Sequence, residues 1–185
     1  MAVDGVIASF VLGYHGCDEE NAERILNGEP FNHSSNEYDW LGGGIYFWQE
    51  NPLRALSFAQ NHPAHKIANP TVVGAIIELG FCLDLLSERG IEQFVSAHAV
   101  LTNLLEAVGK SLPENDLAKK KHHGDRQVID FLHALRESET SELPEFDTVR
   151  GVFIEGQPAY ATSAIHLQSH VQICVRKPKV IKGVF

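Results

Sequence analysis

The sequence predicts one α+β domain, with β-strands toward both ends of the chain and helices in the middle. Runs rich in β-branched and aromatic residues, which favour strands, occur before residue 81 and again after residue 148. Between about residues 86 and 140, apolar residues instead recur near helical spacing. The chain has 185 residues, 44% of them hydrophobic and 21% charged, so it can bury one sizeable core. We therefore assign residues 1–185 to a single domain.

The first half of the chain is predicted to alternate strands with short helices. Strands are expected at residues 6–14, 43–48 and 71–80. Helices are expected at residues 18–28 and 51–62. Asp18 and Asn51 are suitable N-caps for these helices, and Gly28 suits the end of the first one. The stretch "EPFNHSSNEYDW" reads as a polar connection between the first helix and the second strand.

The second half begins with helices and returns to strands. Apolar residues at helical spacing predict helices at residues 87–109 and 125–138. From residue 149 the chain reads as extended, first in "RGVFIEG" and then in "SHVQICVRKPKVIKGVF", where Pro178 divides two runs. The helical middle segment therefore covers about residues 86–140.

Charge and cysteine content argue against several classes of protein. The net charge of −9 disfavours non-specific binding to nucleic acid. The cysteines, Cys17, Cys82 and Cys174, are odd in number, widely spaced and without a C-x-x-C motif, which argues against a disulfide framework or a thiolate metal site. No apolar run approaches the ~20 residues of a membrane helix, and the first residues lack the basic region of a signal peptide. We expect a cytoplasmic protein with no membrane partner.

The stretch "YDWLGGGIYFW", residues 38–48, sets three glycines directly against an aromatic strand. Such a run suits a phosphate-binding loop, a tight turn, or close approach of the backbone to a flat ligand. A dinucleotide-binding fingerprint needs G-x-G-x-x-G at the start of a helix, whereas this run opens a strand. The phosphate-binding loop is therefore disfavoured.

Three segments together resemble a known superfamily. "LGYHG" at residues 12–16 ends a strand, "GGGIYFW" at residues 42–48 opens the next strand, and "HVQICVRKP" at residues 170–178 forms a late strand. In this order they resemble the ADP-ribosyltransferase superfamily, in the His-Tyr branch that includes diphtheria-type toxins and the poly(ADP-ribose) polymerases. The resemblance covers roughly residues 6–62 and 150–185 and leaves the helical middle segment unplaced.

The resemblance implies two small, mostly antiparallel sheets around an NAD cleft, with the helical middle segment as an insertion. NAD would be the substrate, with nicotinamide as the leaving group. His15 would hydrogen-bond the adenosine-side ribose, Gly16 would offer backbone groups to the carboxamide, and Tyr46 would stack on the nicotinamide. Gly44, just before Tyr46, would let the strand bend and the ligand lie close.

The second aromatic face and the reacting-ribose contact depart from the family pattern. The usual second aromatic position falls on Ser57, so we assign this face to Phe58, with Trp48 as the alternative and a plain core role for Phe58 also open. Gln172 stands where the family carries a glutamate. A glutamine accepts the same ribose hydrogen bond, but it brings no charge and cannot act as a base. This difference favours transfer of single ADP-ribose units.

These residues predict an NAD-dependent mono-ADP-ribosyltransferase that releases nicotinamide, with His15, Tyr46 and Gln172 as the catalytic residues. Two alternatives stay open: an inactive module that binds NAD or ADP-ribose, and an NAD glycohydrolase with water as the acceptor. A protein, a nucleic acid or a small molecule remains open as the acceptor. The basic tail from Arg176 to Lys182 is a candidate for steering the pyrophosphate or an anionic acceptor.

Other polar residues carry weaker functional expectations. His170 shares a strand face with Gln172, which makes it a candidate for contacting the acceptor or acting as a base. Glu78 and Glu155 are candidates for supplying the charge that Gln172 lacks. Four further histidines lack the pattern of a known metal site and are expected at the surface: His62, His65, His122 and His123.

Overall fold

The structure is a computed structural model that describes residues 6–36, 39–62, 65–116 and 122–185. Its strands are β1 (Val6–Asp18), β2 (Ile45–Gln49), β3 (Pro70–Asp84), β4 (Thr148–Phe153), β5 (His170–Val175) and β6 (Ile181–Val184). Its α-helices are α1 (Glu19–Leu26), α2 (Pro52–Gln60), α3 (Glu88–Ala107) and α4 (His123–Glu137). A short 3-10 helix, η2 (Pro178–Val180), connects β5 to β6. The predicted α+β class is confirmed.

The six strands form one sheet in the order β1-β2-β5-β4-β3-β6, and β1 also pairs with β3. The pairing of β3 with β4 is parallel and the other pairings are antiparallel. The expectation of two separate sheets is therefore wrong. The reason is the length of β1 and β3, 13 and 15 residues. They pair with each other from Val6↔Phe81 to Asp18↔Pro70 and still reach other strands along their second edges.

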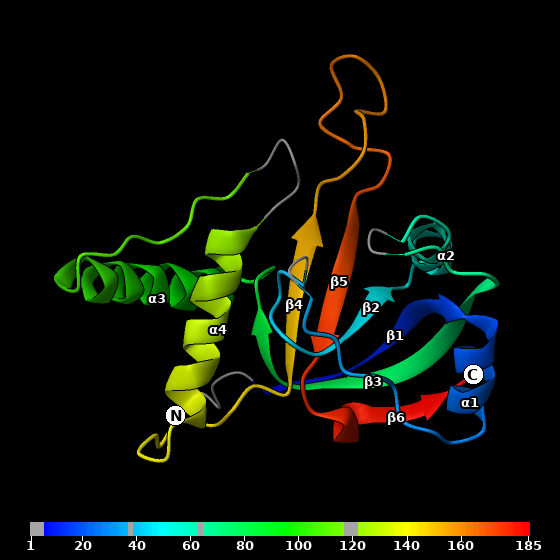
Figure 1. Cartoon of the computed structure of the whole chain (residues 1–185), viewed down its shortest axis with the longest axis horizontal. Coiled ribbons are helices and arrows are strands. Elements are labelled where there is room, and N and C mark those ends of the chain that lie inside the picture. The colour runs from blue at the N-terminus through cyan, green and yellow to red at the C-terminus, as the bar shows by residue number, and fades with distance from the viewer. Residues whose placement is uncertain (1–5, 37–38, 63–64, 117–121) are drawn as a thin grey trace.

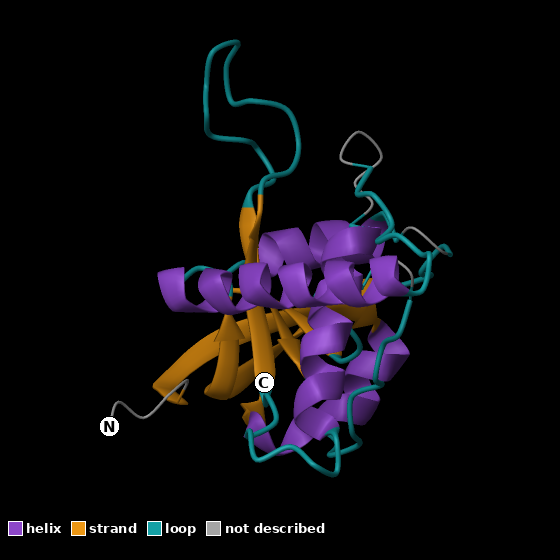
Figure 2. Cartoon of the chain, turned by 90° about the vertical axis from the view of Figure 1, so that its left-hand side faces the viewer, coloured by secondary structure: helices purple, strands orange, loops and turns teal. Residues whose placement is uncertain are grey.

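Helices flank the sheet at two places (Figure 1). α1 and α2 pack on β1 and β3, whereas α3 and α4 pack on each other beside the far end of β3. Figure 2, turned by 90°, shows the same sheet behind α3, with the connection between β4 and β5 projecting beyond the strands. None of the described helices combines the length and the apolar content needed to cross a membrane.

The core divides into two main groups of buried side chains. One group lies between the sheet and the α3–α4 pair and includes Leu41, Leu83, Val128, Ile129, Phe146 and Val149. The other lies on β2, β3 and β5 and includes Ile45, Phe47, Ile77, Leu79, Ile173 and Val175. The segment between β1 and β2 therefore contributes to the first group through Leu41, which ties the glycine run to the helical middle segment.

Local signals in the sequence explain most helix ends. Asp18 accepts a hydrogen bond from the Glu20 amide at 3.2 Å, and Asn51 accepts one from the Arg54 amide at 3.0 Å, as N-caps do. Gly28, just after α1, has a φ of +98°. β1 and β3 are longer than predicted, because pairing with β3 carries β1 to Asp18 and pairing with β4 carries β3 to Asp84.

Candidate functional site

A cleft of about 460 Å³ opens where β1 and β2 separate. Its walls come from the end of β1, from α1, β2, α2 and β5, and from residues 32–36, 39, 62, 65 and 67. Five of the residues predicted as a site line it together: His15, Gly16, Tyr46, Phe58 and Gln172. They come from β1, β2, α2 and β5, so the fold brings together segments that lie far apart in the sequence.

The cleft exists because the β1–β2 ladder is short. These strands pair only at Gly13↔Gln49 and Tyr14↔Trp48 within the described residues. At the next position the His15 side chain, and not the backbone of β1, bonds to β2, since its Nδ1 lies 2.9 Å from the backbone oxygen of Tyr46. An imidazole therefore occupies the place of a ladder hydrogen bond and holds the two strands apart.

The backbone of Gly16 faces this opening. Leu12 O accepts a hydrogen bond from the Glu50 amide at 2.9 Å, so the backbone groups of Leu12 point toward β2. Backbone directions alternate along a strand, so those of Tyr14 and Gly16 point to the same side. A Cβ atom on Gly16 would lie 2.2 Å from the backbone oxygen of Ala55, so a glycine is required for α2 to pack here.

His15 is held as a neutral imidazole. A nitrogen that faces a carbonyl oxygen must carry a proton, so Nδ1 donates to Tyr46 O and Nε2 is left as an acceptor. Burial lowers the pKa of His15 from its ordinary value, and the bond to Tyr46 opposes this only in part. The rings of Phe31 and Phe47 lie 5.4 and 5.8 Å from the imidazole and fix its plane. In this arrangement Nε2 can accept a hydrogen bond from a hydroxyl group.

Tyr46 uses its hydroxyl to fix the glycine run. The hydroxyl donates to Gly42 O at 2.8 Å and accepts from the Leu41 amide at 2.9 Å. Burial raises the pKa of this phenol well above its usual range, so it stays protonated. Gly42 has a φ of +85°, which favours glycine at this turn. The phenol thus stabilises the turn through two hydrogen bonds, and Tyr46 also lines the cleft.

Gly44 differs from its predicted role. It is buried and packs on β5, where an added Cβ would lie 2.4 Å from Cys174 Sγ and 2.7 Å from the Val175 oxygen. It is not among the described residues that line the cleft. The close approach that requires this glycine is therefore between two strands and not between a strand and a ligand.

Gln172 faces the cleft beside the aromatic residues of β2. It pairs in register with Trp48, and Tyr46 lies two residues before Trp48, so all three side chains project from one face of the sheet. Only 9% of Gln172 is exposed. Its amide oxygen lies 3.4 Å from the indole nitrogen of Trp40, at the long limit for a hydrogen bond.

Trp48 and Phe58, the two candidates for the second aromatic face, both line the cleft. Their ring centroids lie 4.8 Å apart with an interplanar angle of 42°. Trp48 is 2% exposed and belongs to the core as well. The two rings therefore form one aromatic wall from β2 and α2.

A polar wall on the other side was missed by the sequence analysis, which read it only as a connection. It consists of Asn32, His33, Ser34, Ser35, Asn36 and Asp39. Asp39 is 3% exposed, and its Oδ2 accepts from Ser34 Oγ at 2.6 Å and from the Asn36 amide. Burial raises the pKa of the Asp39 carboxyl, and the two hydrogen bonds oppose that shift. The signal in the sequence was the density of hydrogen-bonding side chains in "NHSSN".

Imidazoles are the basic groups of the cleft. His33, His62 and His65 line it together with His15, and the described lining residues include no lysine or arginine. As expected, His65 is exposed, whereas His62 is half-buried, and the rings of the two histidines lie 4.2 Å apart. No group of three His, Cys, Asp or Glu side chains in the described part of the chain is arranged to hold a metal ion.

Several weaker candidates lie elsewhere. His170 is buried, with Nδ1 2.7 Å from Gln168 O and its ring stacked on Phe153. Glu155 pairs with Arg54 at 2.6 Å, and Glu78 pairs with Lys182 at 2.8 Å. None of these three candidates is among the described lining residues of the cleft.

The basic tail is also neutralised by neighbours. Its members pair with carboxylates in Arg176–Glu137, Lys177–Glu145, Lys179–Asp147 and Lys182–Glu78. None of its cations is among the described residues that line the cleft. The tail therefore does not supply the cleft with positive charge by direct contact.

Comparison with known proteins shows similarity to an archaeal protein. An uncharacterized protein of Methanocaldococcus jannaschii is 26% identical over 189 residues, covering 91% of this chain and 83% of the relative. No family model matches the chain. No solved structure matches it.

Proposed function

We propose that this protein binds NAD in the cleft and acts as a mono-ADP-ribosyltransferase with an ADP-ribosyltransferase-like fold. It would transfer ADP-ribose from NAD to an acceptor and release nicotinamide. The supporting observation is that His15, Tyr46 and Gln172, predicted from three separate segments, line one cleft.

NAD would lie across the gap between β1 and β2. The Nε2 acceptor of His15 suits a ribose hydroxyl, and the edge of Gly16 suits a carboxamide, which needs one donor and one acceptor. The nicotinamide of NAD is a flat cation, for which the aromatic residues Tyr46, Trp48 and Phe58 are suitable neighbours. Each proposed contact thus has a matching chemical group in the cleft.

In the proposed reaction the bond between C1′ of the ribose and the nicotinamide nitrogen breaks. The bonding electron pair leaves with nicotinamide, which becomes neutral, and positive charge develops on the ribose. The acceptor then forms a bond to C1′ and loses its proton. Gln172 would hold a ribose hydroxyl through its amide oxygen, but a neutral amide stabilises the developing charge less than a carboxylate does.

We assign the missing negative charge to Asp39. The acidic residues among the described lining residues are Asp18 and Asp39. Both oxygens of Asp18 accept backbone amides, from Glu20 and Asn69, whereas the hydrogen bonds from Ser34 and Asn36 both fall on Asp39 Oδ2. Asp39 lines the cleft together with Gln172 and directly precedes Trp40, whose indole contacts Gln172. A buried carboxylate acts more strongly on a developing charge than an exposed one.

The inactive binding module is the second candidate, and Gln172 favours it. The Gln172 oxygen already faces the Trp40 indole, and the side chain cannot act as a base. NAD hydrolysis with water as acceptor differs from transfer only in whether ADP-ribose ends free or attached.

The test is incubation of the protein with NAD and measurement of free nicotinamide, alongside calorimetric titration with NAD. We expect nicotinamide release with wild-type protein and its loss in Tyr46→Ala. Leu53→Ala is the control, because Leu53 is 79% exposed on α2 and is not among the lining residues. Saturable NAD binding without release would support the binding module. Absence of both binding and release would refute the proposal.

A further inference from the structure

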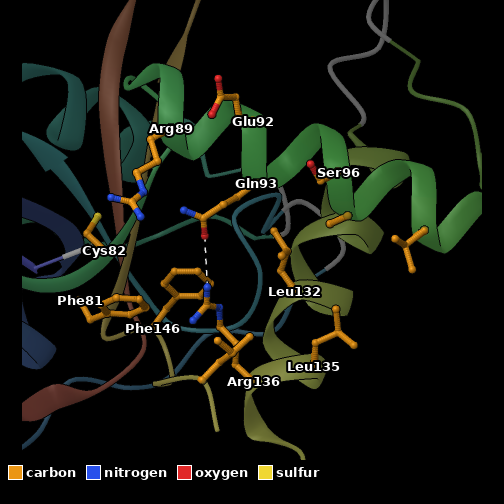
Figure 3. A pocket seen from close by; sticks show the side chains of 13 residues that line it. Phe81, Cys82, Arg89, Glu92, Gln93, Ser96, Leu132, Leu135, Arg136 and Phe146 are labelled. Carbon is orange, nitrogen blue, oxygen red and sulfur yellow. Dashed lines mark hydrogen bonds between the residues drawn. The ribbon is translucent and has the colours of Figure 1, made fainter. Parts of the chain in front are cut away.

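A second concavity of about 510 Å³ lies between α3 and α4 and above the end of β3; we refer to it as the α3–α4 hollow (Figure 3). None of its described lining residues lines the cleft. Its volume falls within the roughly 300–1,000 Å³ typical of small-molecule sites. It belongs to the helical middle segment, for which the proposed reaction provides no role.

The walls of the α3–α4 hollow are mainly apolar. Phe81 and Phe146 stack at its base, with ring centroids 5.1 Å apart and an interplanar angle of 16°. Around its edge lie three large apolar side chains that remain in water: Val100, Leu135 and Leu143 are 49%, 45% and 56% exposed. Apolar side chains gathered around a concavity are typical of a binding surface.

A partly buried cation lies in this apolar setting. The guanidinium of Arg136 lies over the Phe146 ring, 4.2 Å from its centroid. It donates to Gln93 Oε1 at 3.2 Å and to Pro144 O at 2.8 Å, both neutral acceptors. Among the described residues no carboxylate forms an ion pair with Arg136. Burial lowers the pKa of this guanidinium, with no opposing acid.

The other charged residues of the α3–α4 hollow leave it positive. Arg89 and Glu92 come from the first turns of α3. Figure 3 shows Arg89 and Gln93 reaching from α3 toward the hollow, with Glu92 directed to the other side of the helix. Two guanidinium groups and one outward carboxylate therefore surround an apolar space.

We propose that the α3–α4 hollow binds a small organic carboxylate with an apolar body. The planar guanidinium of Arg136 matches a carboxylate in shape and charge, and such bonds are about twice as strong as neutral ones. The apolar walls would cover the rest of the ligand. This site is independent of the reaction in the cleft, so its test does not depend on NAD.

The test is calorimetric titration of the full chain with decanoate, benzoate and decanol. Decanoate is expected to bind saturably and at least about tenfold more tightly than decanol, because only the acid makes a charge-assisted bond. Benzoate reports whether a short aromatic body suffices. Arg136→Gln should weaken decanoate binding about tenfold and leave decanol binding unchanged.

Arg136→Gln is not sufficient alone, because Arg136 also donates hydrogen bonds to Pro144 and Gln93 and its loss can disturb folding. A second variant therefore tests the site without changing Arg136. Leu135→Glu places a negative charge at the exposed edge of the α3–α4 hollow and should repel decanoate. Leu53→Glu is the matched control, on an exposed position of α2. Equal binding by both variants, or no saturable binding of either acid, would overturn the proposal. So would a dimer in sedimentation that Leu135→Glu dissociates, since a second copy would then cover the α3–α4 hollow.

Discussion

The imidazole of His15 bonds to the backbone oxygen of Tyr46 at 2.9 Å, one residue beyond Tyr14 on β1 and two residues before Trp48 on β2, the last paired residues of the two strands. This bond joins the first two motif segments and sets the width of the cleft between them. It also leaves Nε2 as an acceptor, since Nδ1 carries the proton. One residue therefore supports the fold and, in the proposed function, contacts the ligand.

His15→Ala is therefore expected to weaken NAD binding by about tenfold or more, because a hydrogen bond and the positioning of Tyr46 are lost together. Thermal unfolding should also occur at a lower temperature, since the Tyr46 oxygen loses its partner. His123→Ala serves as the control, because His123 begins α4 and is not among the described lining residues. Unchanged NAD affinity in a folded His15→Ala protein would contradict the proposed contact.

Tyr46→Phe separates the ring of Tyr46 from its hydroxyl. Removing the hydroxyl leaves the Leu41 amide and Gly42 oxygen without their partner, which costs roughly 1–3 kcal/mol of the free energy of unfolding. The ring stays, so nicotinamide stacking and the Kd for NAD should change little. Denaturant unfolding and calorimetry measure the two effects. A large loss of NAD affinity with unchanged stability would show that the hydroxyl contacts the ligand.

Gly44→Ala tests the strand–strand contact that replaced the predicted ligand contact. The new Cβ would lie 2.4 Å from Cys174 Sγ, so β2 and β5 must shift, at a cost of roughly 1–3 kcal/mol in the free energy of unfolding. Gly183→Ala in β6 is the matched control, because its nearest atom is 3.9 Å away. The midpoint of denaturant unfolding should fall for Gly44→Ala only. Equal midpoints would mean that the strands adapt without strain.

The sequence predicted those features that depend on neighbours along the chain. Asp18 and Asn51 cap their helices as expected, since a cap needs only a side chain and the next amides. The full length of β1 and the single sheet were not predicted, because pairing of β1 with β3 joins residues up to 75 positions apart, as in Val6↔Phe81. Local patterns contain no information about such partners.

The same distinction holds for the candidate site. His15, Tyr46 and Gln172 were predicted from a resemblance that compares segments far apart in the sequence, and the three residues line one cleft. The polar wall with Asp39 was missed, because the burial of the Asp39 carboxylate depends on the tertiary fold and not on the neighbouring sequence. Gly44 was predicted to lie close to a ligand, because a sequence does not show whether a glycine faces a ligand or a strand.

NAD binding should strengthen as the pH falls below about 6.5, the ordinary pKa of histidine. The pyrophosphate of NAD is anionic, and the imidazole of His62, which lines the cleft, becomes positive when it takes up a proton. Burial and the neighbouring His65 lower the pKa of His62, so its contribution appears toward the acidic side. Calorimetry across this pH range measures the effect.

His62→Asn should flatten this pH dependence while leaving NAD affinity at pH 8 nearly unchanged, because a neutral imidazole contributes no charge. Nicotinamide, which lacks phosphate, is the control ligand and should bind with no comparable rise at low pH. A pH dependence identical in wild type and His62→Asn would remove this imidazole from the pyrophosphate site.

The charge assigned to Asp39 is testable by moving it. Asp39→Asn should lower the rate of nicotinamide release about tenfold or more with a smaller change in the Kd for NAD, because the charge acts on the transition state. Burial raises the pKa of Asp39, so its carboxyl ionises at a higher pH than an ordinary aspartate. Wild-type release should therefore rise with pH as this carboxyl loses its proton. Asp39→Asn should lack that limb of the pH profile.

Gln172→Glu should restore release in the Asp39→Asn background, because it returns a carboxylate to the cleft. A purely structural role for Asp39 in holding Ser34 and Asn36 predicts no such rescue.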